Sequence, residues 1–87
     1  MYLIVVYDIE VPRIDKVRAL LRRYLFWVQN SVFEGEASES AYAAMTKELL
    51  AIIDQEIDSV IIYRLKSQDS AQRTVLGIEK AMSDFVV

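Results

Sequence analysis

Carboxylates, hydroxyls and cations are the groups with which this sequence could do chemistry, because it contains neither histidine nor cysteine. The usual general base at neutral pH, the usual nitrogen ligand for a metal and the thiol nucleophile are therefore all excluded. Asp8 has the most informative position among the acids, since it ends a nearly unbroken apolar run that begins at Tyr2. A strand tip is a rigid place for a reactive acid, but an aspartate there also commonly serves as a turn or cap residue.

A second copy of the chain would give Asp8 a chemical role. A two-fold dimer can bring two Asp8 carboxylates to its axis, where their like charges repel unless a cation lies between them. Mg²⁺, with Mn²⁺ as a substitute, needs only one or two carboxylates and keeps its waters, one of which could attack a phosphodiester. Asp8 is therefore a candidate catalytic residue and metal ligand, with a turn or cap role as the alternative. Glu10 could help Asp8 at this site, or it could be a solvated loop acid. Ser31 is an improbable nucleophile, because the sequence offers no base to activate it.

A cluster of cations could contact nucleic acid, although the net charge of the chain is -3. Five of the ten basic residues lie within eleven positions, namely Arg13, Lys16, Arg18, Arg22 and Arg23. Such a cluster could follow the phosphates of a nucleic acid, or it could be an ordinary solvated helix face. Arg13 and Lys16 are nearest to Asp8 and are the predicted nucleic-acid contacts.

The elements that position these residues follow from the hydrophobic pattern. The run from Tyr2 to Asp8 indicates a buried central strand, covered on one face by helices and on the other by a second protomer. A helix begins near Pro12, whose missing N–H is tolerated in a first turn. Its apolar residues recur at spacings of three, four and seven and form one stripe, which consists of Ile14, Val17, Leu20, Leu21, Tyr24 and Leu25.

The rest of the chain supplies three more strands and one more helix. Phe26–Glu36 predicts two short strands joined by a tight Asn-Ser turn, with one longer bulged strand as the alternative. Ser38 is a good N-cap for a second helix that extends to Asp54, and Asp58–Leu65 predicts a further strand. With right-handed crossovers, this order gives an α+β, ferredoxin-like βαββαβ sandwich with both helices on one face of the sheet.

The end of the chain is predicted to reach a partner. Residues 1–87 make a single domain, in which residues 67–87 form a turn, a strand and a tail. The strand, Arg73–Ile78, has little left to pair with in its own domain, so we expect it to pair with the sheet edge of the other protomer of a homodimer. The tail Phe85–Val87 either packs there or frays.

Composition indicates a small, dense, cytoplasmic protein. The chain has 87 residues, of which 54% are hydrophobic, with only two glycines and one proline. A domain of this size gains stability from oligomerisation. No basic region precedes the apolar start, and no apolar stretch approaches the roughly 18 residues of a membrane span.

Four aromatic residues lie within the predicted strands, namely Tyr2, Tyr7, Trp27 and Tyr63. They could stack on bases, but their place in the strand pattern favours the core.

A family resemblance is carried by three segments, which are Val5–Asp8, Trp27–Glu36 and Asp58–Arg64. Together they resemble the Cas-two family, the small CRISPR-associated protein of spacer acquisition, over nearly the whole chain. The resemblance implies a ferredoxin-like homodimer, a C-terminal strand that lies against the partner protomer, and a complex with the Cas-one integrase. It also implies, for several members, a magnesium-dependent endonuclease acting on RNA, single-stranded RNA included, or on double-stranded DNA, with Asp8 as the metal ligand. The alternative is a non-catalytic scaffold that joins integrase dimers and supports the DNA.

Overall fold

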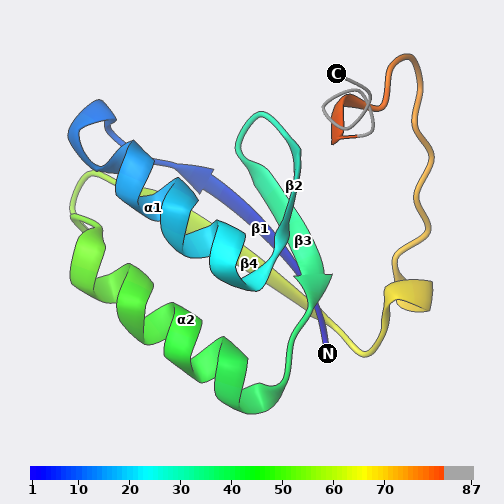
Figure 1. Ribbon diagram of the computed structural model, residues 1–87, viewed down its shortest axis with the longest axis horizontal. Helices are drawn as coiled ribbons and strands as arrows, with labels where there is room; N and C mark the ends of the chain where they lie inside the picture. The colour runs from blue at the N-terminus through cyan, green and yellow to red at the C-terminus, as the bar shows by residue number, and fades with distance from the viewer. Residues whose placement is uncertain (82–87) are drawn as a thin grey trace.

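The computed structural model describes residues 1–81, which form one antiparallel sheet with both helices on the same side (Figure 1). The strand order is β2-β3-β1-β4. The elements are β1 Tyr2–Asp8, α1 Val11–Tyr24, β2 Phe26–Gln29, β3 Val32–Glu36, α2 Glu39–Ile52, β4 Ser59–Leu65 and a short 3₁₀ helix, η1 Gln68–Ser70. This is the predicted ferredoxin-like arrangement. Within the described part of the chain, neither helix has the length and apolarity that a bilayer crossing requires.

The strands β2 and β3 are joined by a tight turn at Asn30 and Ser31. Asn30 has a φ of 43°, in the left-handed region that asparagine tolerates better than most residues. The pairing register shifts between Trp27 and Gln29, which marks a local irregularity in β2. The prediction of two short strands is therefore confirmed, and the alternative of one long bulged strand is excluded.

Helix α2 begins as its sequence predicts and ends slightly earlier. The Ser38 hydroxyl accepts a hydrogen bond from the Ala41 N–H at 3.1 Å, as expected of an N-cap. The helix ends at Ile52 rather than at Asp54, and the Ile53 N–H closes its last turn by donating to the Leu49 carbonyl at 2.9 Å.

The core lies between the helices and one face of the sheet. In β1, the side chains of Leu3, Val5 and Tyr7 are buried against the helices, as alternation along a strand requires. Phe33 of β3 pairs with Val5 and is the largest fully buried side chain among residues 1–81. The covered face is thus continuous across the central strands.

The other face of the sheet is apolar and only partly covered. Ile4 and Val6 of β1 lie on this face, opposite Tyr63 and Ile61 of β4. Tyr63 is 55% exposed and Ile61 49% exposed. The expectation that Tyr63 lies in the core is therefore wrong for the single chain, because its register places it on the face without helices.

The segment after η1 runs alongside the β2–β3 edge of the sheet (Figure 1), and Arg73 attaches it there. The Arg73 guanidinium donates to a Glu34 carboxylate oxygen at 2.8 Å, and the Tyr2 hydroxyl donates to the same oxygen at 2.8 Å. Burial, together with this hydrogen bond to an anion, raises the pKa of Tyr2 to about 12. The contact fixes the start of the C-terminal segment on the uncovered face.

Residues 73–78 form no strand in the single chain. Their apolar side chains are exposed, and Leu76 is 91% exposed. Pairing of this segment with a second protomer therefore stays a prediction, and the tail Phe85–Val87 lies outside the described residues.

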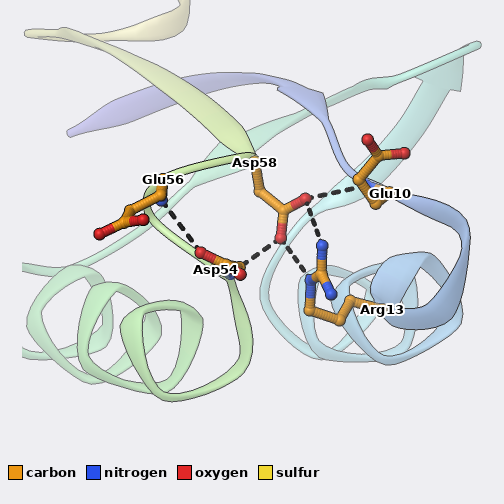
Figure 2. Close-up of polar contacts among 5 residues, drawn as sticks. All are labelled: Glu10, Arg13, Asp54, Glu56 and Asp58. Carbon is orange, nitrogen blue, oxygen red and sulfur yellow. Dashed lines mark hydrogen bonds and ion pairs between the residues drawn. The ribbon is translucent and has the colours of Figure 1, made fainter.

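A buried carboxylate holds together the two connections at one end of the sheet (Figure 2). Asp58 lies directly before β4, and its side chain is fully shielded from solvent. Arg13 of α1 donates to it through Nε at 2.6 Å and through Nη2 at 3.0 Å. The backbone N–H groups of Glu10 and Asp54 add hydrogen bonds of 2.9 and 2.8 Å. Four donors from three segments thus converge on one side chain.

These donors determine the charge state of Asp58. The hydrogen bonds from Arg13 and from the backbone of Glu10 and Asp54 hold the pKa of the Asp58 carboxyl well below its usual range, although burial alone would raise it.

Strand β4 begins at Ser59 and not at the predicted Asp58, because the Asp58 N–H donates to the Asp54 carbonyl at 2.7 Å instead of joining the sheet.

Truncation of a buried core side chain should destabilise the fold. We expect Phe33→Ala to lower the free energy of unfolding by about 3–5 kcal/mol, because it removes a fully buried ring and leaves a cavity. Leu50→Ala is the control, since Leu50 is 55% exposed and should cost about 0.5 kcal/mol or less. Urea denaturation measures both values, and equal losses would contradict this description of the core.

The pH dependence of stability should report on Asp58. Because the folded-state pKa of Asp58 is depressed, its contribution is complete above the ordinary aspartate pKa of about 3.9 and is lost as the pH falls through the lower folded value. Asp58→Asn should therefore be less stable than the wild type at pH 7, and the difference should shrink in strong acid. Denaturation midpoints measured from pH 7 to pH 2 test this, and a constant difference would contradict it.

Candidate active site

Asp8 is the last residue of β1, and its carboxylate is exposed. It pairs with Ser59 at the beginning of β4, and alternation along β1 places it on the same face as Ile4 and Val6. Within residues 1–81 no hydrogen bond or ion pair occupies this carboxylate. This acid, the site residue that the sequence predicts, is therefore free to bind a ligand at the edge of the uncovered face.

One chain supplies only part of a metal site around Asp8. No group of three or more acids that could hold a metal occurs in the described part of the chain. Mg²⁺ is commonly bound through one or two carboxylates and retains several waters, so a single exposed Asp8 fits one half of a shared site. The nearby Glu10 uses its backbone N–H to bind Asp58, and its carboxylate points away from Asp58 in Figure 2. A helper role for Glu10 stays a prediction.

Three of the five clustered cations are used inside the chain. Arg13 pairs with Asp58, Arg18 donates to the Tyr7 hydroxyl at 3.2 Å, and Arg23 pairs with Glu48 at 2.6 Å. These contacts attach α1 to β1, to α2 and to the loop before β4. A solvated helix face does not account for these three cations, and neither does a continuous row of phosphate contacts.

Lys16 and Arg22 are the cluster members that stay available. Both are exposed, and neither forms a hydrogen bond or an ion pair with another residue of the described chain. Lys16 was one of the two predicted nucleic-acid contacts. The other, Arg13, has a structural partner that holds Nε and Nη2, so any phosphate contact by Arg13 would have to use its remaining donors.

Asp58 is the residue of this region that the sequence did not identify. Its main partner, Arg13, lies 45 positions away in the chain. The only local signal is a charged residue directly before an apolar strand, and this pattern is also typical of ordinary solvated loop acids. Ser31, by contrast, belongs to the β2–β3 turn, where its carbonyl accepts the Tyr7 N–H at 3.0 Å.

Comparisons with known proteins identify a family for the chain. The family model described as CRISPR associated protein Cas2 matches residues 1–73. A protein of Methanothermobacter thermautotrophicus named CRISPR-associated endoribonuclease Cas2 is 48% identical over 87 residues, which is 100% of this chain and 96% of that protein. A relative with the same family name from Thermodesulfovibrio yellowstonii is 50% identical over 86 residues, covering 99% of this chain and 98% of its own length.

Solved structures give the same result. The crystal structure of a Cas2 protein has a TM-score of 0.86 at 44% identity, covering 93% of this chain and 91% of the other. The structure of Streptococcus pyogenes Cas2 has a TM-score of 0.78 at 30% identity, covering 88% of this chain and 100% of the other. The family model and these relatives show the family, and the sheet order and the free strand-tip acid are consistent with it. The chain belongs to the CRISPR-associated Cas2 family.

Proposed function

We propose that this protein is a homodimeric, metal-dependent endonuclease in which Asp8 of each protomer contributes to one shared site. The observation that carries the proposal is the free, exposed Asp8 carboxylate at the rim of an apolar sheet face without helices. Two such faces packed together would remove Ile61 and Tyr63 from water and place the two strand tips near a common axis. The exposed apolar residues of the C-terminal segment, such as Leu76, support the same pairing.

The reaction assigned to the site is hydrolysis of a phosphodiester. When bound, Mg²⁺ or Mn²⁺ would activate a water for attack on the phosphorus atom. Each protomer would supply one Asp8 carboxylate to hold the cation, and the exposed Lys16 and Arg22 would attract the phosphate backbone. RNA is the favoured substrate because the relatives are named endoribonucleases, with double-stranded DNA as the alternative. The complex with the Cas-one integrase and the cytoplasmic location belong to the same proposal.

A second function is favoured by the small number of acids at the site. Because the described residues hold no cluster of three acids, any cation there depends on few protein ligands, and slow chemistry is expected. The protein could then act as a non-catalytic scaffold that joins integrase dimers and supports DNA. The two functions do not exclude each other.

Removal of the Asp8 charge should abolish cleavage. Asp8→Asn, and likewise chelation of divalent cations, should reduce the rate of RNA cleavage by about 100-fold or more, which corresponds to roughly 3 kcal/mol of lost transition-state stabilisation. Asp15→Asn is the matched control, because Asp15 is an exposed acid on α1 and its substitution removes the same charge. Undiminished cutting by purified Asp8→Asn would refute the catalytic proposal, and intact spacer acquisition by that variant in cells would assign the biology to the scaffold.

The free lysine should contribute to nucleic-acid binding. Lys16→Ala is expected to reduce the slope of log K against log salt concentration by about one, as the loss of a single phosphate contact does. Lys47→Ala removes the same charge from α2 and serves as the control. Fluorescence anisotropy of labelled RNA and DNA at several salt concentrations measures the slopes. Arg13→Ala is unsuitable for this test because it also leaves Asp58 without its cation.

A further inference from the structure

The connection that follows Asp8 is short and is held at its second residue. Only Ile9 and Glu10 separate β1 from α1, and the Ile9 side chain is buried. The Glu10 N–H donates to Asp58 at 2.9 Å, while the Glu10 carbonyl accepts the Arg13 N–H at 3.0 Å. The backbone two residues beyond Asp8 is therefore bound on both of its polar groups.

Asp58 also directly precedes the residue that pairs with Asp8 across the sheet. Asp8 pairs with Ser59, the residue directly after Asp58, and this is the last pair of the β1–β4 ladder. The terminal pair of a ladder opens more easily than its interior unless something else fixes the chain. Here the Asp58 side chain fixes both chains at once, since it binds Glu10 after β1 and itself precedes β4.

We propose that Asp58, together with Arg13, is a positioning residue for Asp8: this ion pair sets the direction in which the Asp8 carboxylate leaves the sheet and so prepares it for the divalent cation. This inference rests on the proposed function. Side chains that orient the ligands of a metal commonly change its affinity when they are substituted, although they never touch it. Asp58 fits that role because it is fully shielded from solvent and cannot itself meet a ligand.

A purely structural role is the competing explanation, and the affinity of the folded protein for Mn²⁺ separates the two. An ion pair that only stabilises the fold would lower the melting temperature and leave the Mn²⁺ affinity of the remaining folded protein unchanged. A positioning pair would lower that affinity even under conditions in which the variant is fully folded. Mn²⁺ is a suitable probe because free and bound ions differ in their electron paramagnetic resonance signal.

The experiment compares full-length variants at a temperature at which circular dichroism shows each of them to be folded. Asp58→Asn and the milder Arg13→Gln should both weaken Mn²⁺ binding, by about 10- to 100-fold for Asp58→Asn. Hydrogen exchange at the Glu10 amide should be faster in both. Glu48→Gln is the matched control, since it breaks a 2.6 Å ion pair with Arg23, roughly 15 Å further along α1. It should leave both measurements unchanged.

The outcomes discriminate between the explanations. Weaker Mn²⁺ binding with unchanged kinetic KM for RNA and a lower kcat supports the inference. Wild-type Mn²⁺ affinity in folded Asp58→Asn overturns it, whatever happens to the melting temperature, and so does an equal loss in Glu48→Gln. If Asp8→Asn binds Mn²⁺ as the wild type does, the proposed function itself fails, and the positioning role fails with it. Failure of the proposed function can be distinguished from failure of the positioning role alone, because the Asp8→Asn measurement does not involve Asp58.

Discussion

The structure depends on one constraint, which is that a sheet with two apolar faces has helices for only one of them. Helices α1 and α2 bury Leu3, Val5 and Tyr7 of the central strand, while Ile4 and Val6 lie on the opposite face. A chain of this size has no further element with which to cover that face among its described residues, apart from the segment attached by Arg73. In the proposed dimer a second molecule would bury the remaining apolar area, and Asp8 lies at the rim of that face.

The second determinant is the charge held at the end of the sheet. Burial of a carboxylate away from water lowers the stability of the fold unless the carboxylate is paired and hydrogen-bonded. Asp58 accepts hydrogen bonds from four donors. The same arrangement uses Arg13, which otherwise would be one of the exposed cations of α1. Clustered basic residues in this protein are therefore of two kinds: those that fix α1 to its neighbours, and those, such as Lys16, that stay free for a ligand.

The fold could be predicted largely from the sequence, because local signals coincide with the elements. The apolar run to Asp8, the N-cap Ser38 and the Asn-Ser turn each act within a few residues, so their consequences are visible in the pattern. The partnership of Asp58 with Arg13 could not be predicted, since it joins residues 45 positions apart and both have an ordinary solvated interpretation. Tyr63 was misplaced for a related reason: an apolar strand pattern does not say which of its two faces the helices cover.

If two Asp8 carboxylates share one cation, the stoichiometry of Mn²⁺ binding will show it. Native mass spectrometry of the wild-type protein counts bound ions and chains in the same particle. We expect a wild-type dimer that carries one Mn²⁺, and an Asp8→Asn dimer that carries none. A wild-type protein that binds one ion per chain as a monomer, or an Asp8→Asn dimer that retains its ion, would contradict it.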